Sequence, residues 1–175
     1  MQEPGGEELI TQTIVWESDA GELETRTRVI TRAEQQAQFR AREAQRQSAS
    51  LGPSAAQIPS LIIDCNNQNA LWLFDGGFLG GNQLCLYRNP VDSIAVADLG
   101  RILRPGLPIQ SWAGAVRSLW AGMDSGNLAT CDLVPARCYT APAPYQGFDA
   151  WEKLEYIYTT PGYPTSPNTA WLDIY

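Results

Sequence analysis

Short apolar runs separated by turn residues dominate the second half of this 175-residue chain. From residue 61 onward these runs are Leu61–Ile63, Ala70–Phe74, Gln83–Tyr87 and Val116–Trp120. Glycine, asparagine and proline separate them, and these are the residues that tight turns require. The pattern predicts an all-β sandwich.

The N-terminal segment has a different composition. Ile10–Trp16 and Leu23–Ile30 are rich in threonine, valine and isoleucine, and residues 18–22 between them are turn formers. This arrangement predicts a β-hairpin with one face in water, which would be only marginally stable alone.

A helix is expected directly after the hairpin. Thr31 and Glu34 have the spacing of a capping box, and the stretch that follows to about Ser48 is rich in alanine, glutamine and arginine. Most of its apolar positions are alanines, so we expect light packing. The simpler interpretation is a solvated spacer, and the alternative is a helix that binds a partner or mediates self-assembly.

Residues 48–60, with Gly52, Pro53 and Pro59, have the composition of a linker. We therefore divide the chain into an N-terminal hairpin, helix and linker (1–60), a β domain (61–158) and a C-terminal tail (159–175). The tail is rich in proline and aromatic residues, which suits either a recognition surface or a segment that folds back and buries Trp171.

Composition narrows the range of functions. The chain has no histidine, which removes the usual general base and the usual zinc ligand. Its net charge is -7, so it offers no basic stripe for nucleic acid. No run reaches the roughly 18 apolar residues of a membrane span. Asp149 and Glu152 are an ordinary surface pair, so we expect no catalytic residues, no cofactor and no enzyme activity.

Four cysteines, Cys65, Cys85, Cys131 and Cys138, predict two disulfides. A zinc site with four thiolates is the alternative, but the usual C-x-x-C knuckles are absent, so we expect no metal. Three connectivities are possible; we favour Cys65 with Cys85 across neighbouring strands and Cys131 with Cys138 closing a local loop.

Disulfides indicate an oxidising compartment, so we expect a secreted or cell-surface protein. The acidic N-terminus lacks a signal peptide, which fits a mature form with an added start methionine. A cytosolic protein with free thiols is the alternative.

The most informative stretch is Leu71–Gly81, an aromatic strand followed by a glycine-rich folded hairpin. It resembles the Greek-key signature of βγ-crystallins, with Phe78 and Gly80 as the final aromatic and glycine. Phe74 and Trp72 lie four and six residues before Phe78, whereas five is usual.

The resemblance continues beyond this hairpin. Ser111–Trp120 looks like the closing strand of the first key, and Ile94–Leu103 could form the short helical loop between the two pieces. A looser second key would span residues 127–158, with Leu154–Tyr158 as its closing strand. The resemblance implies a sandwich of two Greek keys, extended by the N-terminal hairpin and helix.

Calcium-binding members of this family place acidic, amide and hydroxyl ligands in the turn before the closing strand, because calcium prefers oxygen. The corresponding positions here are residues 113–118, of which only Ser118 fits. Arg117 places a positive charge where a hydroxyl should coordinate, and the turn near Glu152 in the second key lacks a serine or threonine. We therefore expect no calcium site.

Exported bacterial relatives of crystallins include peptidase inhibitors and killer-toxin-like proteins. A bridge between Cys131 and Cys138 would hold a stiff loop whose residues are Leu133, Val134, Pro135, Ala136 and Arg137. A rigid loop loses little entropy on entering a protease cleft. We expect a non-catalytic binding protein with a protein partner, for which a peptidase is the candidate. The alternative is that the loop is an ordinary hairpin closed by a disulfide.

The alternative function is structural. The N-terminal hairpin and helix would then join copies of the chain into a homo-oligomer, because an exposed hairpin edge can add a strand from a neighbour.

Overall fold

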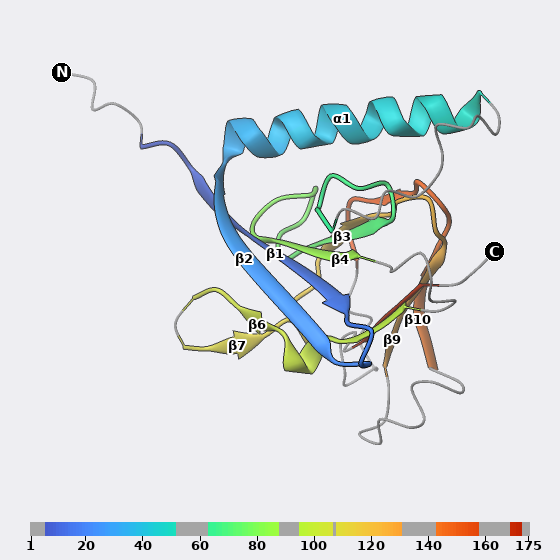
Figure 1. The fold of residues 1–175 in the computed structure, drawn as a ribbon. Coiled ribbons are helices and arrows are strands. Elements are labelled where there is room, and N and C mark those ends of the chain that lie inside the picture. Colours follow the sequence, from blue (N-terminus) through green and yellow to red (C-terminus); the bar gives the residue numbers. More distant parts are fainter. Residues whose placement is uncertain are drawn as a thin grey trace.

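The computed structural model describes residues 6–51, 63–87, 95–106, 108–130, 143–157 and 169–172. Most of these residues lie in β-sheets, and one α-helix crosses them (Figure 1). The elements are β1 (Leu9–Glu17), β2 (Leu23–Thr31), α1 (Arg32–Ser50), β3 (Ala70–Phe74), β4 (Gln83–Tyr87), β5 (Ala95–Asp98), the 3-10 turn η2 (Leu99–Arg101), β6 (Leu103–Arg104), β7 (Gln110–Ser111), β8 (Ser118–Trp120), β9 (Gly126–Thr130), β10 (Ala143–Phe148), β11 (Lys153–Leu154) and β12 (Thr169–Leu172). The all-β class expected from the sequence is confirmed for this part of the chain.

The predicted N-terminal hairpin is present and belongs to a larger sheet. β1 and β2 pair antiparallel over nine residues each, from Leu9 opposite Thr31 to Glu17 opposite Leu23. On its other side β1 runs parallel to β4, with Gln12 opposite Gln83. The resulting six-stranded sheet has the order β11-β8-β3-β4-β1-β2. The boundary that the sequence suggests at residue 61 therefore separates two segments that share one sheet.

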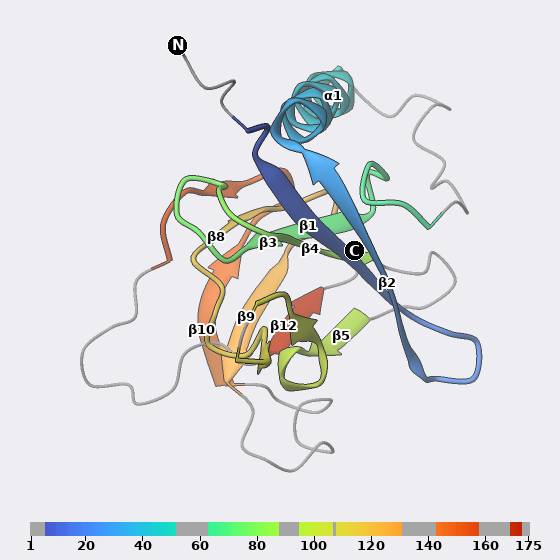
Figure 2. The same ribbon diagram turned by 90° about the vertical axis from the view of Figure 1, so that its left-hand side faces the viewer.

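Helix α1 begins as the capping box predicts. The Thr31 hydroxyl accepts a hydrogen bond from the Glu34 backbone at 3.1 Å, and the Glu34 carboxylate accepts one from the Thr31 backbone at 2.6 Å. The helix extends to Ser50 and lies across one face of the six-stranded sheet (Figure 2). The reciprocal cap satisfies backbone donors that would otherwise lack partners at this end.

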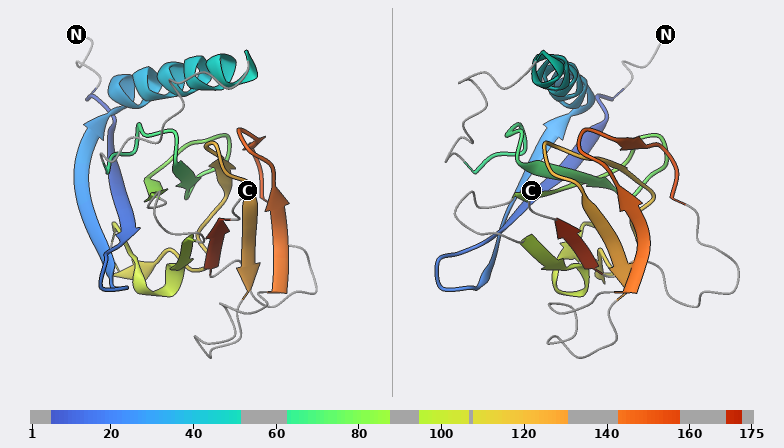
Figure 3. Two further views of the ribbon diagram at one scale, coloured as in Figure 1. Left: turned by 45° about the vertical axis from the view of Figure 1, so that its right-hand side comes forward. Right: turned by 90° about the vertical axis from the view of Figure 1, so that its right-hand side faces the viewer.

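Both faces of the six-stranded sheet are covered, which explains why every residue of β3 and β4 is buried. A four-stranded sheet lies on the face opposite α1 (Figure 3). The side chains on that face are aliphatic, and they include Val15, Leu71, Leu73, Leu84 and Leu86. The face under α1 is aromatic and sulfur-rich, and it includes Trp72, Phe74, Cys85 and Trp120.

The four-stranded sheet has the order β10-β9-β12-β5. Its strand β12 pairs with β9 on one side and β5 on the other. Residues 169–172, expected in a C-terminal tail, therefore form an interior strand. Of the expected closing strand Leu154–Tyr158, the described residues 154–157 contribute Leu154 alone to a strand, as part of β11 against β8, and Tyr158 lies outside the described residues.

Strand pairing within residues 63–157 is antiparallel wherever the structure describes it. The three-residue turn η2 is the helical element described there, inside the segment Ile94–Leu103 where a short helical loop was expected. Both observations agree with the sandwich architecture predicted from the short apolar runs.

Candidate binding surface

Among the described strands, β2 is the longest that lies at the edge of a sheet. β2 ends the six-stranded sheet, and its nine residues pair with β1 without a bulge or a proline. From Glu24 to Val29 every residue is exposed. Edge strands in natural proteins are normally short, bent or covered, because their free backbone groups can pair with strands of other chains.

The hairpin register shows which backbone groups of β2 point outward. Antiparallel pairs alternate between those that exchange backbone hydrogen bonds and those that do not. The Ser18 amide donates to Glu22 at 2.8 Å, and the Arg32 amide donates to Glu8 at 3.0 Å. Counting in steps of two from these pairs, the even-numbered residues of β2 bond inward to β1. The backbone groups of odd-numbered residues, including Thr25 and Thr27, therefore face away from the sheet.

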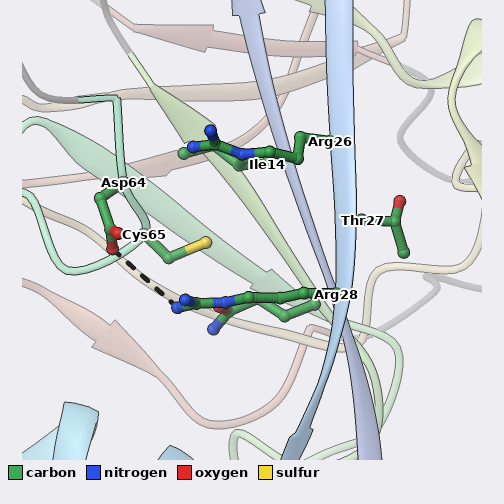
Figure 4. A pocket seen from close by; sticks show the side chains of 7 residues that line it. Ile14, Arg26, Thr27, Arg28, Asp64 and Cys65 are labelled. Atoms are coloured by element: carbon green, nitrogen blue, oxygen red, sulfur yellow. Dashed lines mark hydrogen bonds and ion pairs between the residues drawn. The ribbon is translucent and has the colours of Figure 1, made fainter.

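Two arginines on β2 project over a shallow hollow of about 310 Å³ (Figure 4). Arg26 and Arg28 lie on one face of the strand and reach toward Asp64 and Cys65, while Thr27 points to the other side. The Arg26 guanidinium donates to the Ile63 carbonyl at 2.7 Å. The hollow thus contains two cations held at defined positions beside the open edge.

The second arginine of the hollow is tied to the interior. The Arg28 Nε donates to the Gln12 Oε1 at 2.7 Å, and its guanidinium lies 4.0 Å from the Asp64 carboxylate. The Gln12 amide in turn donates to Gln38 of α1 at 2.7 Å and to Gln83 of β4 at 3.0 Å. Buried amides thereby join the hairpin to the helix and to the sheet.

Arg42 fixes helix α1 to the sheet and is itself only 1% exposed. Its guanidinium donates to the carbonyl oxygens of Ala70 at 2.7 Å and Asn67 at 3.0 Å, and it stacks 3.7 Å from the Trp72 ring centroid. Burial lowers the pKa of Arg42 to about 9, so the group remains a cation at neutral pH. The expectation of a lightly packed, solvated helix is wrong, because polar side chains and Phe39 provide the contact.

The glycine-rich turn between β3 and β4 is closed by a serine from β8. The Ser118 hydroxyl donates to the Gly76 carbonyl at 2.6 Å and accepts from the Leu79 amide at 3.0 Å. The Asp75 carboxylate also accepts from the Asn82 amide at 2.7 Å. Ser118 thus braces the turn, at the position that the resemblance assigned to the closing strand.

The turn between β3 and β4 has an unusual backbone and an exposed aromatic ring. The glycine with positive φ in this turn is Gly81, at 77°, and Phe78 and Leu79 also have positive φ values of 55° and 58°. Phe78 is 73% exposed, and its ring centroid lies 5.9 Å from that of Tyr156. Phe78 therefore pairs with a ring from the second half of the chain.

An arginine side chain lies against the turn at residues 113–118, where calcium-binding crystallins place their ligands. The Arg117 guanidinium donates to the carbonyl oxygens of Gly114 at 2.9 Å and Val116 at 3.2 Å. In the other turn the Glu152 carboxylate accepts from the Asp149 amide at 2.7 Å, so it serves as a turn cap. Among the residues that the structure describes, no three histidine, cysteine or acidic side chains are grouped for a metal.

One of the two predicted disulfides is confirmed. Cys65 and Cys85 are bonded, with their Cα atoms 5.4 Å apart, and the bond lies in the cluster beneath α1. Cys131 and Cys138 lie outside the described residues, as do the predicted loop residues Leu133, Val134, Pro135, Ala136 and Arg137. The strands on either side of that loop pair directly, with Thr130 of β9 opposite Ala143 of β10.

Two features of this surface were not predicted from the sequence. The stripe Gln35, Gln38, Phe39 and Arg42 occupies one helical face at spacings of three and four residues, but a search for apolar positions passes over it. The alternation Thr25-Arg26-Thr27-Arg28 predicts a strand with one face in water, whereas both faces of β2 are exposed from Glu24 to Val29.

In the part of the chain that the structure describes, no helix is long and apolar enough to cross a membrane. The fold and this surface together define a disulfide-containing, mostly β protein with one covering helix and an open edge strand. Comparison of the chain with family models, curated proteins and solved structures found no match.

Proposed function

We propose that this chain is an exported, non-catalytic binding protein that holds an extended segment of a protein partner against the open edge of β2. Its body is a pair of crystallin-like Greek keys. The observation that carries the proposal is the row of outward backbone groups along β2, next to two positioned arginines. Backbone hydrogen bonds would supply affinity, and the side chains at alternate positions would supply specificity.

The strand order supports the two keys. In a Greek key the fourth strand returns to lie beside the first. β8 lies beside β3, the first strand of the first key, while β5 lies in the other sheet. β9 to β12 repeat the arrangement: β12 lies beside β9, and β11 is placed in the six-stranded sheet. The third strand of each proposed key, β5 in the first and β11 in the second, therefore pairs in the sheet that holds the other key.

Export is supported by the Cys65–Cys85 disulfide, because such bonds persist in oxidising compartments. A non-catalytic role is supported by the absence of histidine from the sequence. In the described residues the pKa shifts that stand out belong to Arg42, Glu43 and Arg46, and packing or ion pairing of helix α1 accounts for each.

Peptidase inhibition through residues 133–137 is a second candidate. The direct pairing of Thr130 with Ala143 favours it, because the two ends of the loop would be held together by a strand pair. Inhibition assays against metallo-, serine and cysteine peptidases test this candidate. Arg137→Glu should abolish inhibition, whereas Arg101→Glu, at a side chain 70% exposed elsewhere, should not.

Strand addition is tested by selecting binders from a displayed library of random peptides. We expect enriched peptides with acidic residues two positions apart, to face Arg26 and Arg28. Thr25→Pro should abolish their binding, because Thr25 directs its amide outward and proline removes that donor while leaving the inward bonds of β2 intact.

Thr25→Val is the matched control, since it changes the side chain and keeps the amide. It should bind the selected peptides as the unmodified chain does. Failure to enrich any peptide, or equal binding by the proline variant, would contradict strand addition at β2.

A further inference from the structure

We propose that the partner of the β2 edge is a second copy of this chain, with the two β2 strands antiparallel and Thr25 directly opposite the partner's Thr25. This inference rests on the proposed function, since it assigns an occupant to the same edge. It is carried by the charge sequence of β2, which complements itself in this register.

The charged residues of β2 lie on one face and alternate with threonines. Glu24, Arg26 and Arg28 occupy successive even positions, and Glu22 precedes them in the turn. With Thr25 at the two-fold axis, Arg26 faces the partner's Glu24. Arg28 faces the partner's Glu22, and symmetry repeats both contacts. Opposite charges directly across an antiparallel pair are stabilising.

The hydrogen-bonding pattern agrees with this register. The odd-numbered residues carry the outward backbone groups, and they would meet the odd-numbered residues of the partner, so Thr25 pairs with the partner's Thr25 and Leu23 with the partner's Thr27. The even-numbered charged pairs then fall at the non-hydrogen-bonded positions. Side chains approach each other most closely at those positions.

Neighbouring registers place like charges together. Centring the pair on Arg26 brings that guanidinium against the partner's Arg26. Centring it on Thr27 sets Arg26 against the partner's Arg28 on both sides of the axis, and centring it on Glu24 opposes two carboxylates. The Arg26 and Glu24 registers each retain two attractive pairs but add a like-charge pair, whereas the Thr25 register has four attractive pairs and no like-charge pair. Like charges directly opposite each other are destabilising, so charge favours the Thr25 register.

The conformation of the edge also favours a second strand. Glu24 to Val29 are exposed in the single chain, and the Arg26 guanidinium uses one described hydrogen bond, to Ile63, of the five N–H donors it carries. Arg26 can therefore keep this contact while it meets a carboxylate. The buried amides around Gln12 hold the hairpin in place before pairing.

Sedimentation equilibrium of the full chain at increasing concentration tests the proposal. We expect the mass to double. Glu24→Arg should weaken the dimer by about tenfold or more, because it replaces two attractive contacts by two repulsive ones. The exchanged variant Glu24→Arg with Arg26→Glu should restore dimerisation, since the charges are again complementary. Thr25→Pro should give a monomer, and Thr25→Val should not.

Cysteine cross-linking reports the register. Thr25→Cys should form a disulfide-linked dimer on mild oxidation, whereas Thr27→Cys should not, because Thr27 lies opposite the partner's Leu23. A chain that stays monomeric at all concentrations would overturn the self-pairing, as would a dimer indifferent to Glu24→Arg and Thr25→Pro. If the chain is monomeric but binds displayed peptides in a way that Thr25→Pro abolishes, self-pairing fails and the proposed function stands.

Discussion

The two faces of the six-stranded sheet are covered by different means. Toward the four-stranded sheet, aliphatic side chains such as Leu73 and Leu84 belong to one hydrophobic cluster with Leu128 and Phe148. Toward α1, Arg42 donates hydrogen bonds to backbone carbonyls, and Phe39 places its ring 5.7 to 5.8 Å from three aromatic rings. The aliphatic face depends on apolar area, whereas the helix face depends on directed contacts at a few positions.

The contrast has a physical reason. α1 is rich in alanine and polar residues, so it offers little apolar area to bury. Arg42 compensates for this small apolar area, because its long side chain reaches the sheet and donates hydrogen bonds to backbone carbonyls. The helix face should therefore be sensitive to single polar substitutions, whereas the aliphatic face should respond chiefly to lost volume.

The largest expected effect is that of Arg42→Met. This change keeps an unbranched side chain but leaves the Ala70 carbonyl without the Arg42 donor and removes one of two donors to the Asn67 carbonyl, so we expect a loss of about 3 kcal/mol in the free energy of unfolding. Urea denaturation measures it. Arg40→Met, on the exposed side of the same helix, is the matched control and should change nothing measurable. Equal stability of the Arg42→Met protein would show that apolar packing alone holds the helix, and the contrast would disappear.

Removal of the Cys65–Cys85 disulfide should cost slightly less. The bond closes a loop with a sequence separation of 20, for which the restriction of the unfolded chain amounts to about 3 kcal/mol, reduced by any structure that the unfolded chain retains. Thermal denaturation of Cys65→Ala with Cys85→Ala tests this. A melting temperature equal to that of the unmodified chain would mean that the aromatic side chains beneath α1 stabilise this face of the sheet without the disulfide.

Ser118→Ala should have an intermediate effect. It removes the donor to the Gly76 carbonyl and the acceptor of the Leu79 amide, both in the turn between β3 and β4. We expect a loss of about 2 kcal/mol, because the buried backbone groups left behind lack partners. Ser50→Ala on the exposed end of α1 is the control. If both variants melt alike, the turn is held by its own backbone bonds.

Glu43→Gln should have a small and pH-dependent effect. The hydrogen bond from Arg46 lowers the pKa of Glu43, and Lys153 on β11 contributes to the same shift. A carboxyl group whose pKa is lowered by folding stabilises the folded state at pH values above its ordinary pKa. This stabilisation is lost as the pH falls through the pKa of the group in the folded protein. The variant should therefore be less stable by under about 1 kcal/mol at pH 7. A difference that persisted in strong acid would indicate a packing effect instead.

The smallest expected effect is that of calcium. Because the Arg117 guanidinium already donates to the Gly114 and Val116 carbonyls, calcium cannot approach these oxygens without displacing it. Millimolar calcium or a chelator should leave the melting temperature unchanged within error. A binding isotherm in calorimetric titration would place the ligands elsewhere in the chain.

Features encoded by nearby residues could be predicted. The hairpin, the capping box at Thr31, the short strands and the Cys65–Cys85 bond follow from patterns that span at most a few tens of residues. Ser118 was singled out because of its place in a motif, and it proved to brace a turn about 40 residues earlier in the chain.

Other features required the folded molecule. The parallel pairing of β1 with β4 and the interior position of β12 join segments that are far apart in sequence. The burial of Arg42 depends on carbonyls contributed by the Asn67–Ala70 turn. These outcomes are settled by which surfaces the whole chain can bury together, and no local pattern contains that information.

The sequence by itself determined that this chain forms short strands, a capped helix and a disulfide. Neighbouring side chains set the local backbone preference, and the sequence contains the cysteines that the bond requires. Only the tertiary structure decided that β2 is left at an edge with its arginines over a hollow, because an edge exists only once every other strand has found its neighbours.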